Sequence, residues 1–158
     1  MTDVDSRFAA VWDDPSLSDE ERLVRIDAVA VDCGDEARSA FERAGARDSA
    51  GLEAEAEPLY RRALELGLPD DLRAQAVIQL ASTLRNLGRV AESLDLLRAE
   101  RERGGPLHES ASAFYALSLA SAGDPLSAAS VALDALAPHL PRYGRAVGAY
   151  ARELRPAR

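Results

Sequence analysis

Apolar residues recur at helical spacing along most of this chain, most clearly in residues 74–100. In the first half of that stretch they recur every three or four positions, as on one face of a helix: Val77, Leu80, Ala81, Leu84 and Leu87. Gly88 follows, and glycine commonly ends helices because it adopts the left-handed conformation without strain. A second apolar stripe then contains Val90, Leu94 and Leu97. The stretch predicts two helices joined at Gly88.

The same arrangement of small residues occurs three times. Each copy is described by four positions. The first is a small residue seven positions before the turn glycine, the second is the glycine, the third is a small residue five positions after the glycine, and the fourth lies seven positions after the third. The three copies are Ala44, Gly51, Ala56, Ala63; Ala81, Gly88, Ser93, Glu100; and Ala116, Gly123, Ala128, Ala135. Small side chains let two helices cross closely, and a single pair of this size must stack on a neighbour to bury its apolar face. The pattern therefore predicts three stacked helix pairs.

The residues before the first copy predict helices of less regular pattern. A short helix with one apolar edge ends at Pro15. Ser18 and Glu21 have the spacing of a capping box, which begins a second helix. That helix extends to about Asp32, and Gly34 ends it.

Proline and glycine mark the limits of the copies. Asp124 followed by Pro125 predicts a helix start, with the acid as N-cap and proline in the first turn. Pro58 falls inside the second helix of the first copy and should kink that helix or shift its start. The first two copies lie 37 residues apart and the last two 35, which predicts a longer loop near residues 66–71.

A final helix follows Pro141. Its apolar residues form one stripe at helical spacing: Tyr143, Val147, Tyr150 and Leu154. We expect this stripe to pack on the last pair and to cap the exposed end of the stack.

These intervals and residue types resemble the tetratricopeptide repeat. Residues 60–64, Tyr-Arg-Arg-Ala-Leu, come closest to its second-helix signature. Residues 41–51, 58–68 and 80–89 are similar to a bacterial group of short, stand-alone tetratricopeptide proteins, group five. The resemblance implies an all-α fold, a right-handed superhelical array of antiparallel helix pairs (α-solenoid). It also implies a protein-binding role, usually without catalysis.

The expected organisation is a single structural domain. Residues 1–36 form an acidic helical segment, residues 37–138 hold three tetratricopeptide-like repeats (37–71, 74–106 and 109–138), and residues 139–158 form a C-terminal capping helix.

The net charge of −8 is confined to the N-terminal segment. Residues 1–36 hold eleven acidic residues and three arginines, whereas the remaining residues hold sixteen of each. A nucleic-acid surface needs a basic stripe, so we expect no nucleic-acid partner. No apolar stretch is long enough to cross a membrane, and residues 1–7 do not have the pattern of a secretory signal. With a single cysteine, Cys33, the chain fits a reducing cytoplasm.

In tetratricopeptide arrays the first helix of each pair lines the concave groove. In the second copy Gln75, Gln79, Ser82 and Asn86 form a polar stripe opposite the apolar one, with Arg85 beside it. Equivalent positions in the first copy include Arg38, Glu42, Gly45 and Asp48, and in the third copy Phe114 and Leu117. The candidate partner-binding residues are Asp48, Gln75, Gln79, Ser82, Arg85, Asn86, Phe114 and Leu117.

Each part of this groove has an alternative interpretation. Arginine, asparagine and glutamine can hold a peptide carboxylate or backbone, but Asp48 and Arg85 could instead pair with each other. Phe114 and Leu117 could receive an apolar side chain of the partner. The pattern favours their burial under the C-terminal helix over an open position.

The sequence predicts no catalytic residue, metal site or cofactor. His108 and His139 have no carboxylate at ligand spacing, and Cys33 has no histidine near it in sequence. We therefore expect a scaffold, not an enzyme, that binds a peptide or helix of a partner protein. The first alternative is a module that self-assembles into a homo-oligomer without a peptide ligand. The second is that the acidic segment acts as a lid or attracts a basic partner.

Overall fold

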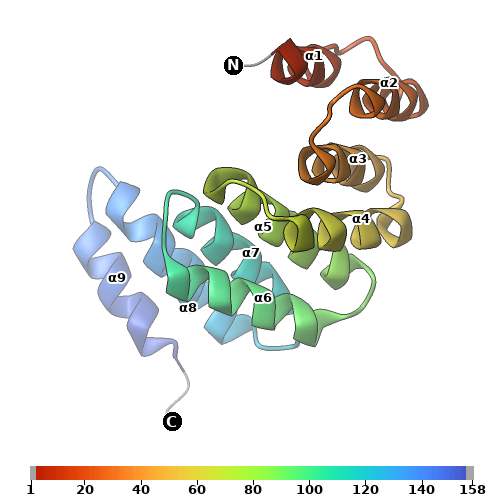
Figure 1. The fold of residues 1–158 in the computed structure, drawn as a ribbon. Helices are drawn as coiled ribbons and strands as arrows, with labels where there is room; N and C mark the ends of the chain where they lie inside the picture. The colour runs from red at the N-terminus through yellow and green to blue at the C-terminus, as the bar shows by residue number, and fades with distance from the viewer. Residues whose placement is uncertain (1–2, 156–158) are drawn as a thin grey trace. The chain divides into compact units, whose positions relative to one another are not determined.

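The computed structural model describes residues 3–155, and within them the chain is all α-helical, without strands. Met1, Thr2 and residues 156–158, the ends of the expected terminal segments, lie outside the described residues. The helices (Figure 1) are α1 (Asp3–Trp12), α2 (Asp19–Val31), α3 (Glu36–Ser49), α4 (Glu53–Leu66), α5 (Asp70–Asn86), α6 (Val90–Arg103), α7 (His108–Ser121), α8 (Pro125–Leu136), the 3₁₀ helix η1 (Ala137–His139) and α9 (Gly144–Glu153). The predicted array of helix pairs is confirmed. None of the described helices combines the length and apolar character that crossing a membrane requires.

Contacts within the chain fall into two compact units, Met1–Thr83 and Leu84–Arg158, with the boundary inside α5. The first unit contains α1 to α4 and most of α5, and the second contains α6 to α9. The expected division into an N-terminal segment, three repeats and a capping helix within one structural domain stays a prediction.

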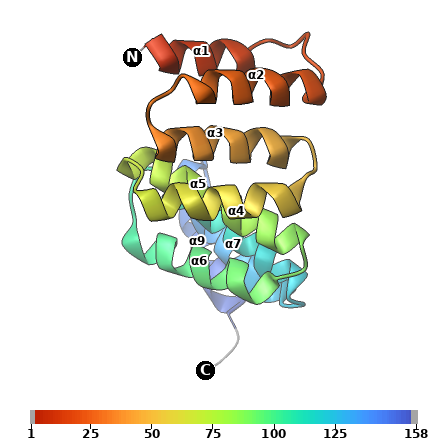
Figure 2. The same ribbon diagram turned by 45° about the vertical axis from the view of Figure 1, so that its right-hand side comes forward.

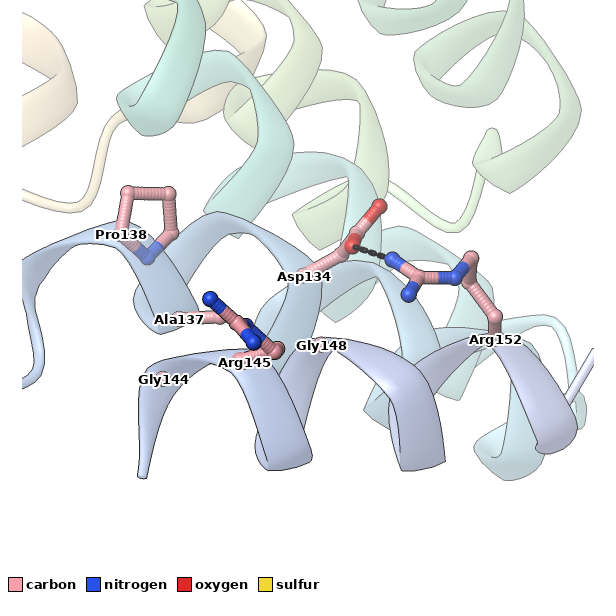
Figure 3. A pocket seen from close by; sticks show the side chains of 7 residues that line it. All are labelled: Asp134, Ala137, Pro138, Gly144, Arg145, Gly148 and Arg152. Atoms are coloured by element: carbon pink, nitrogen blue, oxygen red, sulfur yellow. Dashed lines mark ion pairs between the residues drawn. The ribbon is translucent and has the colours of Figure 1, made fainter. Parts of the chain in front are cut away.

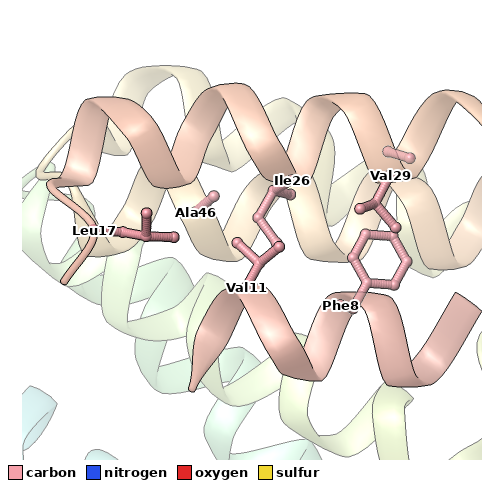
Figure 4. Close-up of a cluster of buried hydrophobic side chains, with 7 residues drawn as sticks. Phe8, Val11, Leu17, Ile26, Val29 and Ala46 are labelled. Atoms are coloured by element: carbon pink, nitrogen blue, oxygen red, sulfur yellow. The ribbon is translucent and has the colours of Figure 1, made fainter. Parts of the chain in front are cut away.

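In the first unit α1, α2, α3 and α4 lie side by side in chain order (Figures 1 and 2). An apolar cluster joins the first three of these helices (Figure 4). It contains Phe8 and Val11 of α1, Ile26 and Val29 of α2, Leu17 before α2 and Ala46 of α3. Burying a side chain of this kind contributes roughly 1.5–3 kcal/mol. The capping box predicted for α2 is present, because Ser18 and Glu21 bond each other's backbone amide.

The small residues of the repeat lie where helices meet. Ala44, Ala56 and Ala63 are completely buried, and α3 packs along α4. The turn glycines of the three copies have left-handed φ values of +73° at Gly51, +79° at Gly88 and +83° at Gly123. The turn geometry predicted for Gly88 is therefore confirmed.

The predicted longer loop after the first copy is wrong. Only residues 67–69 separate α4 from α5, whereas residues 104–107 separate α6 from α7. The extra residues instead lengthen α5, which has 17 residues where α3 and α7 have 14. Pro58 does not shift the start of α4 either, since that helix begins at Glu53 and continues through the proline.

In the second unit α9 packs on α8 and on η1, but not through the stripe expected from the sequence. Its buried residues are Gly148 and Ala151, while Tyr143 and Tyr150 are 78% and 65% exposed. Asp134 of α8 also pairs with Arg152 of α9 (Figure 3). The contact of α9 with α8 is therefore made by small residues, which allow the two helices to approach closely, and not by the aromatic stripe.

Two glycines of α9, Gly144 and Gly148, face Ala137 of η1. A Cβ atom on Gly144 would overlap the carbonyl oxygen of Ala137, a backbone atom that cannot move aside. A Cβ atom on Gly148 would lie 3.6 Å from the Cβ atom of Ala137, an ordinary contact. The first glycine is therefore required by packing and the second is not.

We predict that Gly144→Ala loosens α9 and that Gly148→Ala does not. Overlap at a packed contact costs about 1–3 kcal/mol, whereas alanine for glycine inside a helix stabilises by about 0.4–1 kcal/mol. Urea denaturation and hydrogen exchange of the α9 amides measure both effects. Equal protection of α9 in the two variants would contradict this account of the contact.

Candidate partner-binding site

The polar residues predicted on the second-copy helix differ in how much solvent they meet. Gln75 of α5 is exposed, while Gln79 and Ser82 are half-buried. The backbone oxygen of Gln79 accepts a hydrogen bond from the Thr83 hydroxyl at 2.9 Å. Its side-chain oxygen Oε1 is shielded from solvent and accepts no hydrogen bond from any described residue. This amide group retains hydrogen-bonding capacity that the chain itself does not use.

Asp48 of α3 is bonded to its own chain. Its Oδ1 atom accepts a hydrogen bond from the Thr83 hydroxyl at 3.0 Å, and its Oδ2 atom accepts one from the Tyr60 hydroxyl at 3.3 Å. Both hydroxyls belong to the same unit as Asp48. Asp48 is thus partly engaged within its own unit, and its alternative pairing with Arg85 stays a prediction.

Burial controls the protonation of this group. Desolvation raises the pKa of the Asp48 carboxyl, and the hydrogen bonds from Thr83 and Tyr60 oppose that rise. Tyr60 is fully buried, and its ring lies 6.3 Å from that of Phe41. Desolvation, then the charge of Asp48, raises the pKa of the Tyr60 hydroxyl. Tyr60 therefore stays protonated and acts as a donor.

Arg85 and Asn86 end α5 and belong to the second unit. Arg85 donates from Nη2 to the side-chain oxygen of Asn86 at 3.2 Å. Its Nε atom is shielded and has no acceptor among the described residues. The turn that follows is closed by the amide of Arg89, which donates to the carbonyl of Leu84 at 2.8 Å. Arg85 and Asn86 are thus adjacent in space as well as in sequence.

Phe114 and Leu117 lie on α7, where the sequence favoured their burial under the C-terminal helix. That expectation is wrong for Leu117, which is 48% exposed. Phe114 is half-buried. The reason is that α9 packs on α8 and η1 through its glycines. The second unit therefore presents apolar surface on α7.

The sequence missed a contact between α1 and the first-copy positions expected to line the groove. The indole of Trp12 donates from Nε1 to Oε2 of Glu42 at 2.6 Å, and Arg38 pairs with the other oxygen of Glu42 at 2.7 Å. Arg38 also pairs with Asp5 at 3.4 Å. The Trp12 ring comes so close to Gly45 that a Cβ atom there would lie 3.4 Å from it. Helix α1 therefore covers this part of α3.

One signal for this contact was present in the sequence. Asp5, Phe8 and Trp12 recur at i, i+3 and i+7, the spacing of one helical face. Phe8 lies under the guanidinium of Arg38, whose carbon is 5.6 Å from the ring centre. The spacing predicts that these side chains share one face of α1. It does not predict that this face packs on α3, because that depends on where α1 lies in the fold.

The buried carboxylate of Asp48 gives a test by pH. Because its folded pKa is raised, its contribution to stability is fully present below the unfolded value of 3.8 and is lost as pH rises through the folded value. Asp48→Asn removes this titration and keeps an acceptor oxygen for one of the two hydroxyls. We expect the stability of Asp48→Asn relative to the wild type to increase between pH 4 and pH 7, measured by urea denaturation.

Asp48→Ala is the matched control, because it leaves the Tyr60 hydroxyl without its acceptor, while the Thr83 hydroxyl keeps the backbone oxygen of Gln79. It should lose about 1–3 kcal/mol at either pH. A relative stability of Asp48→Asn that falls as pH rises would mean that hydrogen bonding outweighs desolvation at this carboxylate.

Comparison with known proteins identifies the fold. A family model described as Tetratrico peptide repeat matches residues 37–154, which include all three copies and α9. The search of curated proteins and the search of solved structures each return no match. Repeats of this family generally mediate protein–protein interactions and are generally not enzymes. The chain belongs to the tetratricopeptide repeat family.

Proposed function

We propose that this chain is a cytoplasmic bacterial scaffold that holds an extended segment or a helix of a partner protein in the concave groove of its repeats. The residues proposed to contact the partner are Asp48, Gln75, Gln79, Ser82, Arg85, Asn86, Phe114 and Leu117. The general role of the family in protein–protein interaction supports a protein as the partner.

The exposure of Leu117 is the observation that carries this proposal. A leucine that is 48% exposed, with Phe114 half-buried on the same helix, leaves apolar surface on α7 that a partner side chain can cover. Covering a fully exposed leucine side chain contributes roughly 1.5–3 kcal/mol, so covering this one contributes about half as much. The gain is large enough for specificity and too small to give tight binding alone.

Polar groups would supply the remaining interactions. Gln79 Oε1 and Arg85 Nε have no partner among the described residues, and Gln75 is exposed. Amides can pair with the main chain of an extended segment, and arginine can pair with a carboxylate. Asp48 already accepts two internal hydrogen bonds, which reduces its capacity to bind a partner.

The proposal includes no catalytic step, cofactor or metal, and no nucleic-acid or membrane partner. The balance of acidic residues and arginines after residue 36 supports the exclusion of nucleic acid. His108 and His139 have no carboxylate beside them at the spacing of a catalytic or metal site.

The second candidate is self-association without a peptide ligand. It is favoured by the exposure of Tyr150 on α9 and of Tyr143, which precedes that helix. Large apolar or aromatic side chains gathered on one exposed helix face typically mark an interaction surface.

The test begins with a partner captured from source cells by cross-linking. The cross-linked segment, made as a synthetic peptide, is then titrated against the wild type and against Arg85→Ala/Asn86→Ala. We expect the double variant to bind at least about tenfold more weakly, which corresponds to about 1.4 kcal/mol. Leu117→Ser should weaken binding independently of the polar pair.

Arg62→Ala is the matched control, since Arg62 is half-exposed on α4 and pairs with Glu36. It should bind as the wild type does. Circular dichroism checks that each variant keeps its helices. Unchanged binding by both the double variant and Leu117→Ser would show that the groove assignment is wrong.

A further inference from the structure

Helix α9 has an apolar strip that the chain itself leaves open. The strip, here named the α9 strip, consists of Tyr143, Val147, Tyr150 and Leu154. Val147 and Leu154 are half-buried, but Tyr143 and Tyr150 are 78% and 65% exposed. An amphipathic helix normally turns its apolar stripe toward the core. In α9 the packed face is instead made by Gly144, Gly148 and Ala151, about 100° around the helix from the strip.

A second open strip lies on α2. This α2 strip consists of Val24, Ala28 and Val31, on the side of the helix opposite the buried Ile26 and Val29. Val24 is 65% exposed and Val31 is 75% exposed, and Ala28 is exposed as well. No large apolar side chain among the described residues except Tyr143 is more exposed than Val31.

The two strips have matching spacing. Val24, Ala28 and Val31 recur at i, i+4 and i+7, and Val147, Tyr150 and the C-cap Leu154 recur at i, i+3 and i+7, while Tyr143 precedes the first turn of α9. Each set covers about 10 Å along its helix axis. Rows of side chains at this spacing form the ridges and grooves by which two helices pack.

The surroundings of the strips have opposite charge. Residues 1–36 carry a net charge of −8, whereas residues 139–158 hold five arginines and one glutamate, a net charge of +4. Glu20 is exposed beside the α2 strip, and none of the ion pairs of the described residues includes it. Arg142 is exposed next to Tyr143, whereas Arg145 lies on the opposite side of α9 from Val147 and Tyr150. Such complementarity favours the approach of the two helices and selects this pairing over like-charged ones.

We propose that the α2 strip of a second copy of this chain docks on the α9 strip, so that copies associate head to tail. This proposal rests on the second candidate function, self-association, and names the two surfaces through which the copies would bind each other. Because the two strips differ, each contact leaves one α2 strip and one α9 strip free at the ends of the assembly. Contacts of this heterologous kind build either closed rings or open chains of copies.

The experiment uses the full chain and two variants. Tyr143→Asn/Tyr150→Glu removes the α9 strip, and asparagine tolerates the left-handed φ of +66° found at position 143. Val24→Lys/Val31→Lys removes the α2 strip and adds two positive charges to it. Leu66→Glu is the control, since Leu66 is a partly exposed leucine of α4 that belongs to neither strip. Light scattering then gives the average mass from about 10 µM to about 1 mM protein, a range that detects weak contacts.

The wild type should grow in mass with concentration, and less so at about 0.5 M salt than at about 0.05 M because the charges are screened. Each strip variant alone should associate at least about tenfold more weakly, and Leu66→Glu should behave as the wild type. An equimolar mixture of the two strip variants should form a 1:1 pair that grows no further, because each supplies the strip that the other lacks.

Three results would overturn the proposal. They are a wild type that stays monomeric throughout, a strip variant that associates as the wild type does, and a mixture that forms no pair. Recovery of the pair also shows that both variants are folded at the strip they retain. Peptide titrations below the concentration of association test the groove separately, so failure of one proposal is distinguishable from failure of the other.

Discussion

Close contact between paired helices is the constraint on which the rest of this structure depends. The small residues of the first copy, Ala44, Ala56 and Ala63, are completely buried, and a larger side chain at any of them would force the helices apart. The turn glycines at 51, 88 and 123 have positive φ values, so each chain reversal fits a short connection. Helix pairs formed in this way are flat enough to stack.

The second copy shows how this constraint accommodates a polar residue. Ser93 stands where the other copies have alanine, and it is completely buried. Its hydroxyl lies 2.8 Å from that of Ser118 on α7, and Ser118 in turn donates to the carbonyl of Phe114 at 3.1 Å. A buried hydroxyl without a partner costs about 1–3 kcal/mol. The pair of serines avoids this cost without adding volume at the contact.

The same preference for close contact explains both surfaces proposed for binding. Helix α9 meets α8 and η1 through glycine and alanine, which leaves its tyrosines in solvent and does not bury Leu117 of α7. Had the tyrosines filled the contact, the C-terminal helix would have been a simple cap. The exposed aromatic and aliphatic groups are thus a consequence of backbone proximity at Gly144.

The sequence by itself determined the helices, their turns and the repeat, because each depends on residues close together in the chain. The capping box at Ser18, the left-handed turn at Gly88 and the small residues at fixed intervals are all of this kind. Only the tertiary structure decided the partners of polar side chains. Glu42 is bonded by Trp12, and Asp48 by Thr83, 30 and 35 residues away. It also decided which face of α9 is buried, since a stripe of large apolar residues and a stripe of glycines both satisfy helical periodicity, and only the distance to Ala137 selects between them.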